Sequence, residues 1–226
     1  MKTVTAKFGL PALIAVMGLL YIFFIPSDPE GVKLLFKLIP MGLIFAYAWL
    51  SSHGNRKRYQ LLLLAGLVFC AVGDGTLSWF VIGLSAFLVG HLFYMAAFFG
   101  RWRFAWPRFL TILPIAAYST YMGAELARAL SDDGNGHLIV PVIAYVVVIS
   151  LMAWSAIMSG NLQAVFGALL FVASDSILSW NMFVSDVPYA GPLIMLTYYS
   201  AQFLIAGSAK DRPSTSAGAS ISGSGS

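Results

Sequence analysis

Residues 60–79 read QLLLLAGLVFCAVGDGTLSW, and Asp74 is the only charged side chain among these 20 residues. A helix of about 20 residues crosses the roughly 30 Å hydrocarbon core of a bilayer, so the stretch is typical of a transmembrane helix. A charged side chain in the middle of such a helix costs about 2.5–3.5 kcal/mol on insertion scales and usually faces a cavity or a partner. Asp74 therefore indicates a cavity or a polar partner within the membrane.

The same apolar pattern recurs along the whole chain. Of its 226 residues, 59% are hydrophobic and 10% are charged, and the mean hydropathy is +0.84. Because a soluble domain carries about 25% charged residues, this composition excludes a disordered chain, a nucleic-acid-binding module and an ordinary soluble enzyme. We predict an all-α, polytopic membrane bundle of eight transmembrane helices. The predicted spans are residues 8–25, 33–50, 60–79, 82–100, 108–128, 138–158, 162–184 and 188–208.

Two of these spans repeat each other. Residues 66–79, GLVFCAVGDGTLSW, align without gaps on residues 167–180, GALLFVASDSILSW, with identical Gly, Asp, Leu, Ser and Trp at an offset of 101 residues. The repeat predicts two four-helix halves, about 7–106 and 108–208, within a membrane domain of residues 1–208. Four is an even number of spans, so both halves insert with the same topology, as parallel repeats do.

Charge placement predicts the orientation. Ten of the 13 basic residues fall on the side that holds the two termini, and only Lys33, Lys37 and Arg128 fall elsewhere. The positive-inside rule then places both termini in the cytoplasm, with the protein in the inner membrane if the cell is bacterial. Residues 209–226 are mostly Ser, Gly and Ala, have little apolar surface to bury, and are expected to be disordered.

Two acids occupy equivalent places in the two halves. Asp74 and Asp175 are related by the 101-residue offset, and each follows a small residue that permits close helix approach, Gly73 and Ser174 respectively. The equivalence predicts that the two carboxyl groups lie close together at the base of a cavity between the halves. Both acids fall in the outer halves of their spans, so the cavity is expected to open laterally or toward the outer leaflet. A purely structural role in helix pairing stays open.

Other polar residues inside the spans are candidates for supporting the acids or binding a ligand. His91 and Tyr94 are three residues apart and share a helix face, where they either support the site or belong to the core. Lys37 either extends its ammonium group to the membrane interface or pairs with an acid or a phosphate. The last span carries a cluster that could bind substrate or join helices: Tyr198, Tyr199 and Gln202.

The sequence offers no metal-binding or cofactor-binding pattern. Cys70 is the only cysteine, and the remaining histidines, His53 and His137, fall in loops on opposite sides of the membrane. A cysteine zinc site and an intrachain disulfide are therefore excluded. We predict no metal, no cofactor and no nucleic-acid partner, so any chemistry would have to use carboxylates.

Several motifs together resemble the lysoplasmalogenase, or YhhN, family. They are GDGTL at 73–77, FLVGHLFY at 87–94, SDSIL at 174–178, YYSAQFLI at 198–205 and the Lys37-x-x-Pro40 pair, and the resemblance covers residues 8–208. Members of this family are integral membrane hydrolases that cleave the vinyl ether bond of lysoplasmalogens to a fatty aldehyde and glycerophosphoethanolamine or glycerophosphocholine. The resemblance implies a lysophospholipid substrate within the membrane lipid. It also implies that Asp74 and Asp175 take the positions of the two catalytic aspartates.

The implied reaction suits a pair of carboxyl groups. Protonation of the vinyl ether β-carbon gives an oxocarbenium ion, which water traps as a hemiacetal, so the site needs one acid and one anion. The residues alone do not decide which aspartate is the acid, which headgroup is preferred, or whether the protein forms oligomers. Two other interpretations also stay open: a proton-coupled transporter and a non-catalytic membrane subunit.

Overall fold

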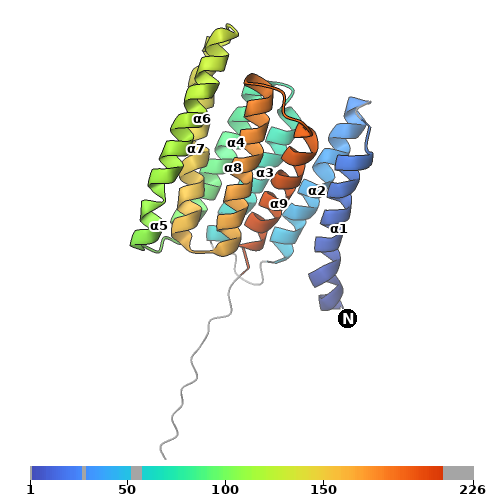
Figure 1. The fold of residues 1–226 in the computed structure, drawn as a ribbon. Helices are drawn as coiled ribbons and strands as arrows, with labels where there is room; N and C mark the ends of the chain where they lie inside the picture. The colour runs from blue at the N-terminus through green and yellow to red at the C-terminus, as the bar shows by residue number, and fades with distance from the viewer. Residues whose placement is uncertain (1, 27–28, 52–57, 211–226) are drawn as a thin grey trace, which may run out of the picture.

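A computed structural model describes residues 2–26, 29–51 and 58–210, with the side chains of residues 2–8 left out of the description. The described residues form helices and no strand, which confirms the predicted all-α class (Figure 1). The elements are α1 Lys2–Phe24, α2 Glu30–Leu50, α3 Arg58–Thr76, α4 Phe80–Phe99, α5 Trp106–Leu110, α6 Ile112–Asp132, η1 Gly136–Leu138, α7 Ile139–Ser159, α8 Leu162–Phe183 and α9 Ala190–Gly207.

The predicted spans correspond to the long helices. Within the described residues, α2, α3, α4, α8 and the η1–α7 unit Gly136–Ser159 are long and apolar enough to cross a membrane, and Gly9–Phe24 of α1 is a shorter apolar helix. The fifth predicted span, 108–128, is divided into α5 and α6. Pro114 cannot donate a backbone hydrogen bond to the carbonyl of Leu110, and its ring crowds that carbonyl, so the first helix ends there.

The helices form a bundle with α1 at one edge and α5 and α6 at the other (Figure 1). The α3–α4 and α8–α9 hairpins pack most extensively, α4 packs on α7, and α2 packs on α9. Helix pairs at the same place in each half therefore pack in the same way, which agrees with a parallel repeat. The repeat itself stays a prediction.

Glycine allows the two hairpins to pack closely. A Cβ atom at Gly66 would lie 2.3 Å from Cε1 of Tyr94, and one at Gly167 would lie 2.8 Å from Cγ1 of Ile205 and 3.0 Å from the carbonyl oxygen of Ala201. A side chain at either position would require the facing atoms to shift, so glycine permits this close approach. The two glycines are 101 residues apart, so the alignment pairs positions with the same packing role.

The packed domain extends past the predicted boundary at residue 208. Ala209 is only 1% exposed, and its carbonyl accepts a hydrogen bond from Nε2 of Gln60 at 3.0 Å. The neighbouring hydroxyl groups of Ser208 and Tyr59 are hydrogen-bonded at 2.8 Å. These contacts hold Ala209, one residue past the predicted boundary, against the start of α3. The disordered tail stays a prediction. Residues 211–226 lie outside the described residues.

Candidate active site

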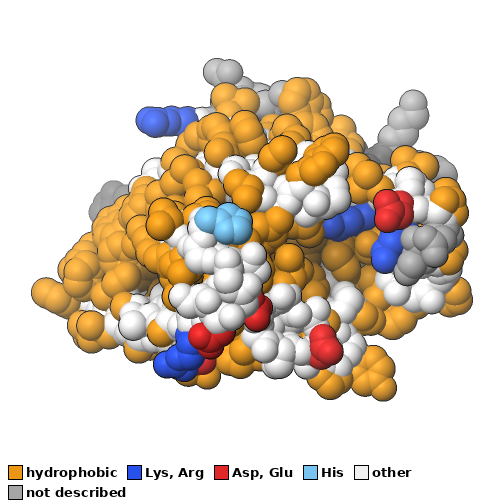
Figure 2. All heavy atoms as spheres, turned by 90° about the horizontal axis from the view of Figure 1, so that it is seen from above, with side chains coloured by type: hydrophobic (Ala, Val, Ile, Leu, Met, Phe, Trp, Pro, Cys, Tyr) orange, Lys and Arg blue, Asp and Glu red, His pale blue; other side chains and the backbone are white. Residues whose placement is uncertain are grey.

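Both predicted acids line one cavity near the end of the bundle that carries the α3–α4 and α8–α9 turns. This cavity, called the polar chamber below, has a volume of about 370 Å³. Its wall comes from α1, α2, α3, α4, α8 and α9 and includes Lys33, Lys37, Asp74, Asp175 and Tyr198. Figure 2 looks down on this end and shows blue side chains at the edge of a hollow in a mostly orange surface.

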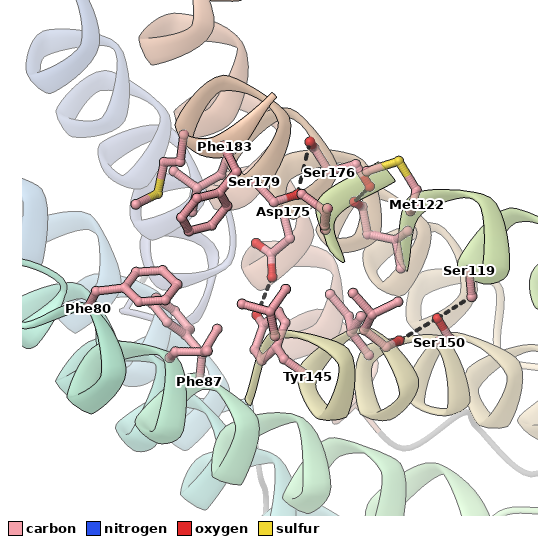
Figure 3. Close-up of a pocket in the computed structure, with 18 of the residues that line it drawn as sticks. Phe80, Phe87, Ser119, Met122, Tyr145, Ser150, Asp175, Ser176, Ser179 and Phe183 are labelled. Carbon is pink, nitrogen blue, oxygen red and sulfur yellow. Dashed lines mark hydrogen bonds between the residues drawn. The ribbon is translucent and has the colours of Figure 1, made fainter. Parts of the chain in front are cut away.

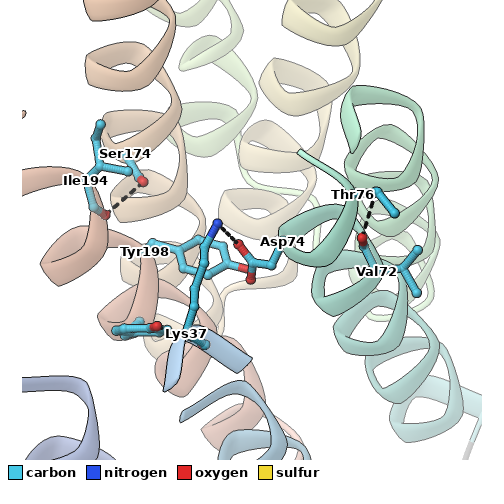
Figure 4. Close-up of polar contacts among 8 residues, drawn as sticks. Lys37, Val72, Asp74, Thr76, Ser174, Ile194 and Tyr198 are labelled. Atoms are coloured by element: carbon cyan, nitrogen blue, oxygen red, sulfur yellow. Dashed lines mark hydrogen bonds and ion pairs between the residues drawn. The ribbon is translucent and has the colours of Figure 1, made fainter. Parts of the chain in front are cut away.

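Both carboxylate oxygens of Asp74 have a polar partner. Nζ of Lys37 lies 3.0 Å from Oδ1 of Asp74, and the hydroxyl group of Tyr198 donates to Oδ2 at 2.5 Å (Figure 4). Asp74 is 5% exposed, and its partners come from α2 and α9. A cation on one oxygen and a hydroxyl donor on the other stabilise the ionised form of a carboxylate. Lys37, whose role the sequence left open, thus pairs with an acid.

Asp175 has a different set of partners. The hydroxyl group of Tyr145, from α7, donates to Oδ2 of Asp175 (Figure 3). Among the described residues no cation lies within ion-pair distance of this half-buried carboxyl group. Asp175 thus lacks the charged partner that Asp74 has in Lys37. The two carboxyl groups that line the polar chamber are therefore chemically unlike.

Tyr145 was not among the candidates from the sequence. Its only signal is one hydroxyl group in the otherwise aliphatic stretch IVPVIAYVVVI at 139–149. That signal is weak, since tyrosine is common in cores and its hydroxyl usually finds a partner there.

His91 and Tyr94 lie behind the chamber wall and do not line it. Both are 0% exposed. Nδ1 of His91 is hydrogen-bonded to the carbonyl of Phe87 at 2.6 Å, and the imidazole ring packs edge-on against Tyr145, with ring centres 5.4 Å apart. His91 therefore contacts the tyrosine that holds Asp175, and touches neither carboxyl group itself.

The predicted substrate-binding residues separate into two groups. Lys37 and Tyr198 line the polar chamber, whereas Tyr199 and Gln202 do not. Tyr199 donates its hydroxyl hydrogen to the backbone carbonyl of Lys37 at 2.8 Å, and Gln202, 0% exposed, accepts from the Tyr94 hydroxyl at 2.6 Å. Gln202 lies one helical turn beyond Tyr198, farther from the chamber, and its hydrogen bond with Tyr94 joins α9 to α4. Its part in substrate binding stays a prediction.

The groups that the chamber offers are carboxyl, hydroxyl and ammonium groups. In the part of the chain that the structure describes, no three His, Cys, Asp or Glu side chains gather in a way that could hold a metal ion. A wider recess of about 770 Å³ adjoins the chamber and shares Lys33, Lys37 and Asp74 with it. Asp74 thus lies where the chamber meets this recess.

The fold and this chamber define a polytopic membrane protein with two unlike carboxyl groups inside its helical bundle. The model of the YhhN family matches residues 32–209, and the chain belongs to that family. It is 33% identical to lysoplasmalogenase TMEM86B of Mus musculus, over 90% of this chain and 87% of the relative. It is 36% identical to lysoplasmalogenase TMEM86A of Homo sapiens, over 84% of this chain and 83% of the relative. A lysoplasmalogenase of Mycobacterium bovis is 29% identical, over 75% and 67%. No solved structure matches the chain significantly.

Proposed function

We propose that this protein hydrolyses the vinyl ether bond of lysoplasmalogens within the membrane, releasing a fatty aldehyde and glycerophosphoethanolamine or glycerophosphocholine. The named activity of its relatives supports the substrate class. The observation that carries the mechanism is the difference between the two acids in one chamber: Asp74 has a cation, whereas the partner of Asp175 among the described residues is a hydroxyl donor.

This difference supports the following division of catalytic roles. Asp175 keeps its proton and acts as the general acid, with the Tyr145 hydroxyl fixing the orientation of its carboxyl group. Asp74 is held as an anion by Lys37 and Tyr198 and stabilises positive charge as it develops. Glycosidases divide two carboxyl groups in the same manner against a similar oxocarbenium ion.

The reaction balances with water as the only co-substrate. The proton of Asp175 passes to the β-carbon of the vinyl ether, and the π electrons of the C=C bond form the new C–H bond. Water then adds to the resulting oxocarbenium carbon and gives its proton to a carboxylate, which leaves a hemiacetal. The hemiacetal breaks its bond to the glycerol oxygen, which takes up a proton, while its own hydroxyl group becomes the aldehyde carbonyl. General acid catalysis of this kind contributes about 10²–10⁴-fold.

The lysines of the chamber suit the phosphate of the substrate. An ammonium group carries three donors, and the ion pair with Asp74 uses one donor of Lys37. Lys33 lies nearer the surface on the same face of α2 and also lines the chamber. The headgroup therefore binds on the α2 side of the chamber, within reach of the polar recess.

We also propose that both termini are cytoplasmic and that the chamber lies near the opposite membrane surface. Arg101, Arg103 and Arg108 lie in or next to the α4–α5 connection, at the end away from the chamber, whereas Asp133 and Asp186 lie at the chamber end. The positive-inside rule favours this orientation, in the inner membrane for a bacterial cell.

Aldehyde release from the purified full-length chain tests the activity. The protein in detergent is given an alkenyl lysophosphatidylethanolamine, with its saturated 1-O-alkyl and 1-acyl counterparts as controls. We expect aldehyde from the alkenyl lipid alone, and nearly complete loss of release in Asp74→Asn and Asp175→Asn proteins that elute as the wild type does on gel filtration. Absence of aldehyde from the wild type, or release that survives both substitutions, would refute the proposal.

A further inference from the structure

A second cavity lies on the other side of Asp175 from the polar chamber. This cavity, called the apolar groove below, runs between α4, α6, α7 and α8 and has a volume of about 80 Å³ (Figure 3). Its lining is dominated by apolar side chains, which include Phe80, Met122, Val142, Val146, Ile149 and Phe183. Asp175 contributes the only carboxyl group to the lining that the structure describes.

The hydroxyl groups of the apolar groove are already engaged within the protein. Tyr118 donates to the hydroxyl of Ser176 at 2.7 Å, and the hydroxyls of Ser119 and Ser150 are hydrogen-bonded at 2.6 Å. Ser150 in turn donates to the carbonyl of Val146 at 2.6 Å. The groove therefore presents little unsatisfied polarity to an occupant, and an apolar occupant suits it best.

Asp175 stands at the boundary between the two cavities. Four residues line both of them: Leu77, Phe87, Asp175 and Leu178. A molecule that filled both cavities would pass Asp175 with its polar end beside Lys37 and its apolar end beside Val146. In a lysoplasmalogen the vinyl ether is the junction between the hydrocarbon chain and the glycerophosphate headgroup, so the bond to be cleaved occupies the same boundary.

We propose that the apolar groove is the binding site for the first carbons of the alkenyl chain, which places the vinyl ether against Asp175. This inference rests on the proposed function for the identity of the lipid. An engineered cavity of about 150 Å³ holds one benzene, so the groove accommodates only a short stretch of chain. Tyr118 and Met182 on its lining are each 44% exposed, so the remainder of the chain continues between α6 and α8 into the bilayer.

A larger apolar cavity on the other side of the bundle is a less suitable seat for the chain. It lies between α1 and α9, measures about 280 Å³, and includes Ile14 and Phe203. Of the lining that the structure describes, it shares Ile22 alone with the polar chamber and includes no carboxyl group. A chain bound there would leave Asp175 away from the bond that has to be protonated.

Photolabelling with an uncleavable lipid tests the site independently of catalysis. The probe is a saturated 1-O-alkyl lysophospholipid with a diazirine on the chain next to the ether, applied to the full-length protein in detergent and mapped by mass spectrometry. We expect labelled peptides from α6, α7 and α8. Labels confined to α1 and α9 would overturn the inference.

Two adjacent valines of α7 provide a matched pair of variants. Val146 lines the apolar groove, whereas Val147 is 49% exposed and lines none of the cavities described above. Val146→Phe should remove most labelling of α6–α8 and lower kcat/KM for a hexadecenyl substrate about tenfold or more, while Val147→Phe leaves both near wild type. Equal labelling of the two variants would contradict the proposed site.

A variant at the opening of the apolar groove provides a second test if Val146→Phe fails to fold. Met182→Trp adds bulk at an exposed position of the opening and should also reduce labelling of α6–α8; unchanged labelling would count against the groove. The outcomes separate the two proposals. Labelled α6–α8 without any aldehyde release refutes the activity and supports the apolar site. Aldehyde release with labels only on α1 and α9 supports the activity and refutes the site.

Discussion

The ion pair between Lys37 and Asp74 places two opposite charges inside the helical bundle. The side chains are 14% and 3% exposed, and Nζ lies 3.0 Å from Oδ1. Lys37→Met removes the cation and leaves a buried carboxyl group whose remaining partner, among the residues that the structure describes, is Tyr198. We expect this change to impair both stability and catalysis, because the charge of Asp74 depends on Lys37.

The magnitude follows from the geometry. Two unit charges at 3.0 Å attract by about 5.5 kcal/mol at an effective dielectric constant of about 20. Desolvation offsets part of that attraction in the intact pair, whereas loss of one partner leaves the other charge uncompensated and costs about 3–5 kcal/mol. Replacing both partners by neutral groups of similar size avoids this penalty. Lys37→Met should therefore lower the free energy of unfolding by about 3 kcal/mol or more, and Asp74→Asn in the same chain should recover much of it.

Denaturant unfolding in detergent, followed by tryptophan fluorescence, measures the four proteins of this double-mutant cycle. Aldehyde release is measured on the same proteins. Lys37→Met should lower kcat as well as raise KM, because both the catalytic anion and a phosphate ligand are lost. Two additive single-variant effects, with no recovery in the double variant, would show that the pair is not coupled. A normal kcat with only a raised KM would show that Asp74 does not need Lys37 to act.

Three further predictions concern other contacts. Tyr145→Phe should lower kcat about tenfold or more with little change in KM, since it frees the Asp175 carboxyl group to rotate; an unchanged kcat would remove Tyr145 from the site. Gly66→Ala should destabilise the α3–α4 hairpin by about 1–3 kcal/mol in the same unfolding measurement, and a neutral effect would mean that the facing ring can move aside. For topology, Ser131→Cys should react with an external membrane-impermeant maleimide and Leu162→Cys should not, and the reverse result would invert the orientation.

The sequence predicts the spans and the two acids because each stands out against its surroundings. A stretch of about 20 apolar residues indicates a membrane span, and a carboxyl group inside it indicates a cavity or a partner. The 101-residue offset of the repeat also relates Asp74 to Asp175 from the sequence alone.

The partners of the acids are harder to predict for a physical reason. A membrane helix is apolar on the face that meets lipid and on the face that meets protein, so periodicity does not reveal which residues point inward. Tyr145 and Gln202 are both polar groups within spans, yet one touches an acid and the other joins helices. Their difference depends on helix rotation and neighbouring helices, which the linear pattern does not encode.

The two cavities that meet at Asp175 are unequal, although the acids beside them are related by one offset. Asp74 has the ammonium group of Lys37 and the hydroxyl group of Tyr198 as partners, whereas the described partner of Asp175 is the hydroxyl group of Tyr145. A scaffold with two similar halves would offer an amphiphile two equivalent directions of entry. Here an ammonium group lies beside one acid and an apolar groove lies beside the other, and the molecule consequently has a polarity that only one orientation of a head-and-tail lipid can match.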